Sequence, residues 1–270
     1  MFESAMTPAE GIAPGPVALV LTTALLAWLA IGEAIAGRVS FRRFLDDLAA
    51  GVPDARSRLY RSWTRWSWVL AAGVLLLAAL APGFGLARLG IAWPQWSSLA
   101  AASAGSGFIK GVLIGTVLML VVSIVAGGVA VNRLRREGAA PAPEAANHAV
   151  TALLPRSRRE RRGYAFLSLT AGVTEEIVYR GFVLAAMVVL LPPLPALAYL
   201  LLSGVVFGLA HAYQGRAGVV TTGIIGVLFM GAYLATGSLL LPIALHVLMD
   251  LNGLRLHAQP DSPPAGTHRD

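Results

Sequence analysis

Apolar runs of about twenty residues, long enough to cross a bilayer as helices, recur along this chain. The composition agrees with them, because 56% of the 270 residues are hydrophobic and only 13% are charged, unlike an ordinary soluble domain. We therefore predict an all-α, multi-pass transmembrane helical bundle of about seven spans. The predicted spans are 16–36, 66–82, 107–131, 164–191, 196–214, 217–235 and 239–256.

The basic residues are concentrated on one side of these spans. Seven arginines lie in 37–65 and eight in 132–163, and with Arg216, Arg255 and Arg269 this side holds 18 of the 21 basic residues. By the positive-inside rule, the amino terminus is outside and the carboxyl terminus is in the cytoplasm. The same rule accounts for the net charge of +7, so we expect no nucleic-acid partner.

The chain divides into three parts by composition. Residues 1–163 contain three spans and basic cytoplasmic loops, residues 164–256 contain four spans, and residues 257–270 are expected to be a disordered tail. The basic connection 37–65 also contains aromatic residues, a composition that suits segments lying at the headgroup level, but we favour a solvated loop with anchors at the membrane interface. Residues 138–149 are expected to form a flexible linker.

A cleaved signal peptide is not expected at the amino end. Residues 34–36 read AIA, which is similar to a cleavage site, but the preceding segment contains Glu3 and Glu10 and no lysine or arginine. A signal peptide begins with a positively charged region. We therefore expect the first span to be retained.

Ionisable side chains occur well inside the spans, where each charge costs at least about 2.5 to 3.5 kcal/mol. Such groups persist only if they are paired, hydrated or useful. Glu33 and Lys110 lie near span ends and can reach an interface, so they need no function. The groups well inside are Glu175, Glu176, Arg180, His211, His246 and Asp250.

The spacing of these groups predicts how they pair. Glu176 and Arg180 are four residues apart, on one helical face and in the favourable order for an ion pair. They can therefore be a structural brace, because breaking a buried pair strands a charge. Glu175 points about 100° away around the helix and needs other partners. The candidates are His211 and His246.

The two histidines lie in other predicted spans. His211 ends a helix whose small residues permit close helix approach. His246 and Asp250 are four residues apart on one face of the last span. A lone membrane histidine is often only an interhelical hydrogen-bond partner, but two histidines beside a carboxylate indicate more. The small residues before His211 are Ser203, Gly204 and Gly208.

These side chains can catalyse hydrolysis in two ways. Glu175 can act as general base on a water that His211 helps to hold, while His246 donates to the oxyanion of an attacked carbonyl. Alternatively, the side chains can bind a divalent metal such as zinc, which activates the water. The chain has no cysteine, so thiolate ligands and a cysteine nucleophile are excluded. The candidate metal ligands are Glu175, His211, His246 and Asp250.

At these residues the chain resembles the CPBP family of intramembrane endopeptidases, which unites eukaryotic type II CAAX prenyl proteases with bacterial Abi proteins. Three motifs of that family, E-E-x-x-x-R, F-x-x-x-H and H-x-x-x-N or D, occur here in the family's order and in separate spans. Each motif alone is weak, but the three together are specific. The matching residues are Glu175, Glu176 and Arg180, then Phe207 and His211, then His246 and Asp250.

The resemblance implies a peptide-bond hydrolase whose cavity opens toward the cytoplasm. Glu175 with His211 would activate the water. Glu176 with Arg180 would shape the site or hold the substrate. His246, with the residue four positions later, would stabilise the oxyanion.

Asp250 departs from the asparagine of the prenyl proteases, although aspartate is common among bacterial members. An ionised carboxylate cannot donate a hydrogen bond to an oxyanion. We therefore expect Asp250 to orient His246, to favour its protonated form, or to contribute to a metal site.

The leading hypothesis is an intramembrane endopeptidase, glutamate-dependent or metal-assisted, of the bacterial inner membrane. Its expected partners are membrane lipid and a peptide or protein substrate cleaved near the cytoplasmic side. The chain lacks the H-E-x-x-H and G-x-G-D motifs of other intramembrane proteases, and Ser203 is not in a G-x-S-x-G setting. Two alternatives stay open: a non-catalytic immunity or scaffold protein of the Abi type, and a proton or ion carrier. The lack of a visible internal repeat argues against the carrier.

Overall fold

The computed structural model describes residues 15–81, 89–94 and 148–256, with a few single positions between 111 and 129. Every regular element in these residues is helical, as the composition predicts, and none of them is a strand. By length and composition, three helices of the described residues can cross a membrane: Pro16–Ala49, Ala55–Leu80 and Ala212–Thr236. Two shorter apolar helices cover Ala196–Ala210 and Leu240–Leu254. The span predicted at 107–131 lies mostly outside the described residues, as do the linker and tail.

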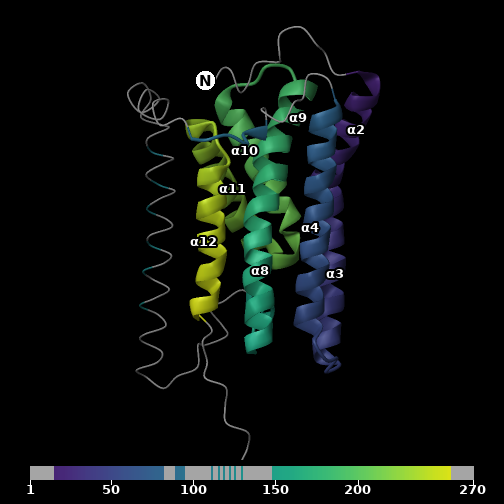
Figure 1. Cartoon of the computed structure of the whole chain (residues 1–270), viewed down its shortest axis with the longest axis vertical. Helices are drawn as coiled ribbons and strands as arrows, with labels where there is room; N and C mark the ends of the chain where they lie inside the picture. The colour runs from purple at the N-terminus through teal and green to yellow at the C-terminus, as the bar shows by residue number, and fades with distance from the viewer. Residues whose placement is uncertain are drawn as a thin grey trace, which may run out of the picture.

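The first helix is longer than the predicted span. It consists of α2 (Pro16–Ala27), a π-helical turn η1 (Trp28–Gly32) and α3 (Glu33–Ala49). Proline suits the first turn, where its missing N–H would have no helical partner. After a turn in which Asp54 adopts a left-handed conformation, with φ of 57°, α4 (Ala55–Leu80) returns beside α3 (Figure 1).

The prediction of a solvated loop at 37–65 is therefore wrong, because most of this stretch is helical. Phe41 and Phe44 lie on one face of α3 and form a buried cluster with Ala55 and Leu59 of α4. Apolar residues at three- and four-residue spacing form the stripe of an amphipathic helix. Most arginines of this region are exposed on two paired helices rather than in a loop, and Arg56 is buried, where its Nε donates to the Ala152 carbonyl at 3.0 Å.

A second long helix carries the glutamate motif. It consists of α8 (Arg158–Glu175), the π-helical turn η3 (Glu176–Phe182) and α9 (Val183–Leu190), after the short α7 (His148–Leu153). Ser157 caps its start by accepting a hydrogen bond of 3.2 Å from the backbone N–H of Glu160. The helix thus begins before the predicted span at 164–191 and includes arginines that precede it.

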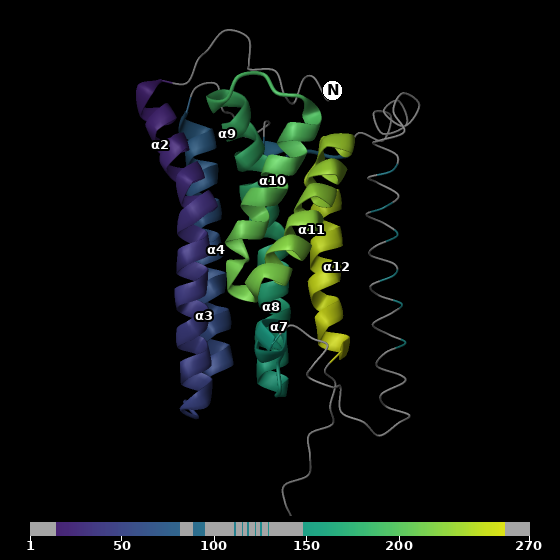
Figure 2. The same ribbon diagram turned by 180° about the vertical axis from the view of Figure 1, so that it is seen from behind.

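The remaining helices pack around this one. α10 (Ala196–Ala210), the 3₁₀ turn η4 (Ala212–Gln214) and α11 (Gly215–Thr236) form a hairpin, and α12 (Leu240–Leu256) follows. Figures 1 and 2 show α8 flanked by α4 and α12, with the turn between α10 and α11 partway along the bundle. The ends of α3, α4 and α8 extend beyond that turn.

Small residues let the helices of this bundle approach closely. A Cβ atom added to Gly172 of α8 would lie 2.4 Å from Val247 Cγ2 of α12. On α10, a Cβ at Gly204 would lie 2.5 Å from Val227 Cγ2, and one at Gly208 would lie 2.5 Å from the Val219 carbonyl oxygen. The predicted role of Gly204 and Gly208 in helix approach is confirmed.

Candidate active site

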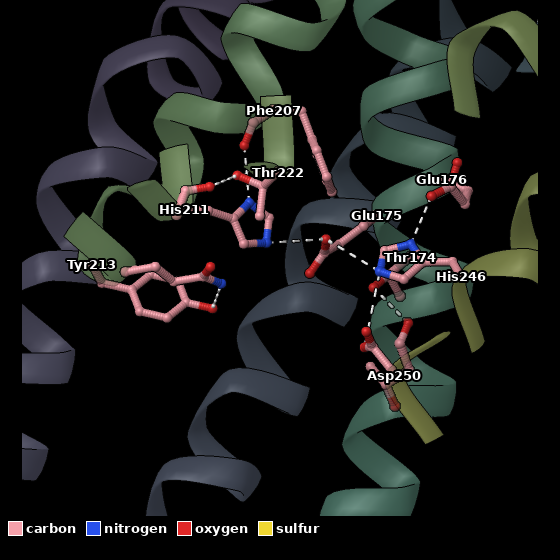
Figure 3. Close-up of polar contacts among 12 residues, drawn as sticks. Thr174, Glu175, Glu176, Phe207, His211, Tyr213, Thr222, His246 and Asp250 are labelled. Atoms are coloured by element: carbon pink, nitrogen blue, oxygen red, sulfur yellow. Dashed lines mark hydrogen bonds and ion pairs between the residues drawn. The ribbon is translucent and has the colours of Figure 1, made fainter. Parts of the chain in front are cut away.

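The six ionisable side chains predicted inside the spans come from three neighbouring parts of the bundle. α8 and η3 contribute the glutamates and the arginine, the end of α10 contributes His211, and α12 contributes His246 and Asp250 (Figure 3). The α-helix changes to a π-helix between Glu175 and Glu176. Such π-helical turns are often found at functional sites.

Glu176 and Arg180 form the predicted buried ion pair. Arg180 Nη1 donates to Glu176 Oε1 at 2.9 Å, and neither side chain is exposed. The guanidinium also lies over two aromatic rings, with its Cζ 4.1 Å from the centroid of Phe207 and 5.3 Å from that of Phe229. Cation–π contacts of this kind offset part of the cost of removing the charge from water.

Glu176 has a second partner that its spacing from Arg180 does not predict. His246 Nδ1 lies 2.7 Å from Glu176 Oε1, and the side chain of His246 is only 5% exposed. An ionised carboxylate can only accept, so Nδ1 is the donor. The ion pair therefore also fixes the orientation of the His246 ring, whose Nε2 faces Glu175.

Glu175 lies between the two histidines. Its Oε2 is 3.8 Å from His211 Nε2 and 4.0 Å from His246 Nε2. Both separations exceed a direct hydrogen bond, and this buried oxygen has no hydrogen-bond partner in the part of the chain that the structure describes. A water about 2.8 Å from each of two such atoms would bridge them.

The orientation of His211 is set by the residue one helical turn earlier. Its Nδ1 donates to the backbone carbonyl of Phe207 at 2.9 Å, since a carbonyl oxygen can only accept. In the neutral ring, Nε2 is then an acceptor directed at Glu175. The four-residue spacing of the F-x-x-x-H motif therefore has a physical explanation. The ring of Phe207 contacts Arg180, and its backbone carbonyl accepts the hydrogen bond that orients His211.

Asp250 lies at the edge of this group. Its Oδ2 is 3.9 Å from His246 Nε2, and its side chain is 32% exposed. This distance is too long for a direct hydrogen bond. The hydrogen bond that orients His246 is the one that its Nδ1 donates to Glu176. We had expected Asp250 to provide this orientation.

The candidate metal ligands are farther apart than a zinc ion requires. Tetrahedral zinc with bonds of about 2.0 to 2.1 Å brings its ligand atoms to about 3.3 Å from one another. The corresponding separations here are 3.8 to 4.0 Å. No group of three or more histidine, cysteine, aspartate or glutamate side chains in the described ranges is placed to hold a metal ion. The metal-assisted alternative stays a prediction.

Sequence reasoning missed the π-helical turn and Phe229. The centroid of the Phe229 ring lies 5.5 Å from that of His246, and the same ring lies beside Arg180. A phenylalanine in an apolar helix has no distinguishing signal, because its contacts depend on a helix remote in sequence. The π-helical turn has no proline or similar marker either.

Comparison with known protein families agrees with the position of these residues. Residues 162–252 match the model of the family described as type II CAAX prenyl endopeptidase Rce1-like. The match includes the six ionisable residues of the site. Searches among curated proteins and among solved structures found no match.

Proposed function

Because residues 162–252 match the model of the family described as type II CAAX prenyl endopeptidase Rce1-like, we propose that this protein is an intramembrane endopeptidase that activates a water between Glu175 and His211. One observation supports the proposal most. Glu175 Oε2 is buried without a hydrogen-bond partner among the described residues. It lies 3.8 and 4.0 Å from two histidine nitrogens, distances that one bridging water can span.

The proposed first step is attack by this water. Ionised Glu175 and neutral His211 are both acceptors, so one water donates a hydrogen to each and keeps its lone pairs for a carbonyl carbon. As the water oxygen bonds to that carbon, its proton moves to Glu175. When the tetrahedral intermediate collapses, the carbon–nitrogen bond breaks and Glu175 returns the proton to the leaving amine.

His246 is proposed to stabilise the oxyanion. When it is protonated on both nitrogens, Nδ1 donates to Glu176 and Nε2 is free to donate to the developing negative charge. The Glu176–Arg180 pair holds this donor in place, so its orientation is set before the reaction. Positioned donors of this kind need no reorganisation as charge develops.

The proposed substrate is a membrane-associated protein or peptide that enters from the cytoplasmic side of a bacterial plasma membrane. Water can reach the space between Glu175 and the histidines, since the side chains of Glu175 and Asp250 are 23% and 32% exposed.

The test is the variant Glu175→Gln, which keeps the size of the side chain and removes the base. Processing of membrane peptides, compared by mass spectrometry in strains with each form, is expected to fall by about 10²- to 10⁴-fold. Glu160→Gln is the matched control, because it makes the same change near the start of α8, fifteen residues before Glu175. Normal processing by folded Glu175→Gln would overturn the proposal and favour a non-catalytic role.

Chelation tests the metal-assisted alternative. Loss of cleavage after chelator treatment, with recovery on addition of zinc, would require a metal and a different placement of the ligands. Unchanged cleavage is the result expected from the distances between the side chains.

A further inference from the structure

A groove of about 430 Å³ lies between α4 and α8, away from the candidate active site. Tyr60, Arg61 and Arg65 of α4 line one side, and Arg159 and Phe166 of α8 line the other. Gly163, also in its lining, precedes Glu175 by twelve residues, which is about 18 Å along a helix. The groove is therefore at the basic end of the bundle, where α4 and α8 lie side by side (Figures 1 and 2).

Within the described ranges, the charges around the groove are mostly uncompensated. Arg61 and Arg65 are exposed and lie one helical turn apart. Arg65 Nε donates to the Arg61 carbonyl at 3.2 Å, and the other N–H groups of these two side chains have no acceptor among the described residues. Arg159 is the exception, since it pairs with Asp54 at 3.1 Å. Three guanidinium groups line the groove and only that of Arg159 is paired with a carboxylate among the described residues, which favours an anionic ligand, and phosphate in particular.

The floor of the groove is apolar, which distinguishes it from a site for a soluble anion. The Tyr60 ring is buried against α8, and the Phe166 side chain is 59% exposed within the groove. Leu169, one turn further along α8, is 51% exposed. A ligand that has both a phosphate and a hydrocarbon chain would therefore contact arginines at one end and apolar side chains at the other.

We propose that this groove binds one anionic phospholipid. Its phosphate lies among Arg61, Arg65 and Arg159, and an acyl chain follows Phe166 toward the membrane interior. Basic pockets between membrane helices on the cytoplasmic side suit anionic headgroups, whereas a zwitterionic headgroup brings no net charge to match. Asp54 competes with the lipid for Arg159.

The experiment uses the full-length protein in a neutral detergent. Its thermal unfolding midpoint is followed while phosphatidylglycerol, phosphatidylcholine or inorganic phosphate is added. Phosphatidylglycerol is expected to raise the midpoint in a saturable manner, because it binds the folded state, and the other two are not. An equal effect of phosphatidylcholine, or of inorganic phosphate, would overturn the proposal.

Paired variants test the location of the site. Arg61→Gln with Arg65→Gln is expected to weaken the apparent affinity for phosphatidylglycerol by about tenfold or more. Arg42→Gln with Arg43→Gln removes the same charge from exposed positions of α3 and is expected to have no such effect. Equal weakening by the two pairs would show attraction to the whole basic surface and refute the groove.

A third variant predicts a change in the opposite direction. Asp54→Asn frees Arg159 and tolerates the left-handed backbone, so affinity for phosphatidylglycerol is expected to rise severalfold. This result does not depend on folding of the double arginine variant. Unchanged or weaker binding by Asp54→Asn would contradict the assignment of Arg159 to the site.

Discussion

Glu176 connects the stability of the fold to the chemistry of the candidate site. One of its oxygen atoms accepts hydrogen bonds from Arg180 on its own helix and from His246 on α12. Its neighbour Glu175 is partly buried, makes no direct hydrogen bond in the described part of the chain and faces the two histidines. Two adjacent residues of the same type therefore have different roles, because the backbone directs them to different sides of the helix.

Removal of the Glu176 carboxylate is expected to destabilise the protein. In Glu176→Ala, Arg180 would be a buried charge without a counterion, and losses of about 3 to 5 kcal/mol are typical of such changes. Glu175→Ala should unfold close to the wild-type temperature, since its carboxylate makes no direct hydrogen bond to the described residues. Thermal unfolding in detergent measures both.

A double replacement provides the control for this comparison. Glu176→Leu with Arg180→Met removes both charges and is expected to be more stable than Glu176→Ala. It should still lack activity, since His246 loses the acceptor that orients it. A double variant that unfolds as early as Glu176→Ala would show that the lost charge pair is not the cause.

Asp250 is expected to be far less important for cleavage than Glu175. Its carboxylate makes no direct hydrogen bond to His246, so Asp250→Asn should lower the cleavage rate by less than about tenfold, below the range typical of a lost general base. The cleavage rates of Asp250→Asn and Glu175→Gln are compared at equal protein levels. A loss as large as that of Glu175→Gln would make Asp250 a direct participant.

At the scale of the helices, the site depends on close contact between α8 and α12. Gly172 lies against Val247, next to His246 in sequence, and one turn before Glu176. The π-helical turn that follows accommodates one more residue than an α-helical turn. Both features affect where Glu175 and Glu176 lie relative to the histidines.

Gly172→Ala is expected to separate these two helices. The added Cβ would lie 2.4 Å from Val247 Cγ2 and 3.1 Å from the Val247 backbone nitrogen, so a flexible side chain alone cannot make room. We expect a loss of about 1 to 3 kcal/mol in stability, together with weaker cleavage as His246 moves from Glu176.

Gly73→Ala is the matched control, because nothing lies within 4 Å of a Cβ at that position in α4. It should be neutral or stabilising by up to about 1 kcal/mol, since alanine favours a helix. Equal losses in the two variants, measured by thermal unfolding, would show that the α8–α12 contact is not limiting.

At the scale of the whole molecule, helices outside the matched domain are bonded to it and to each other. Glu33 accepts hydrogen bonds of 2.8 Å from the indole nitrogens of Trp28 and Trp66, which joins the first helix to α4. Arg38 Nε donates to the Ala212 carbonyl at 3.3 Å, next to His211. Glu33 was expected only to reach the interface, and this pair of bonds gives it a structural role.

The positive-inside rule predicts the orientation of the bundle, and the absence of cysteine makes it convenient to test. Ala50→Cys lies in the exposed turn between α3 and α4, and Pro192→Cys lies in the exposed connection after α9. An impermeant maleimide added to intact cells should label Pro192→Cys, and should label Ala50→Cys only after the membrane is opened. The reverse pattern would contradict the predicted orientation.

Features that depend on neighbours in sequence could be predicted from the sequence. The helical class follows from long apolar runs, and the Glu176–Arg180 pair follows from a four-residue spacing. Adjacent helical residues point about 100° apart, so Glu175 cannot share Arg180 with Glu176 and must find partners on other helices. The helices at 37–65 were also encoded, in the spacing of Phe41 and Phe44, but the arginines obscured that stripe.

Features that depend on contacts between distant segments were decided by the tertiary structure. The bond between His246 and Glu176 joins residues 70 positions apart and requires α8 to meet α12 at Gly172. The stacking of Phe207 and Phe229 on Arg180 likewise joins three helices. The sequence thus determined which charged residues could pair within one helix and which needed a partner on another helix, because helical geometry is local. Which nitrogen faces Glu175, and at what distance, was decided only by packing, because that distance is set by helices that approach one another in space.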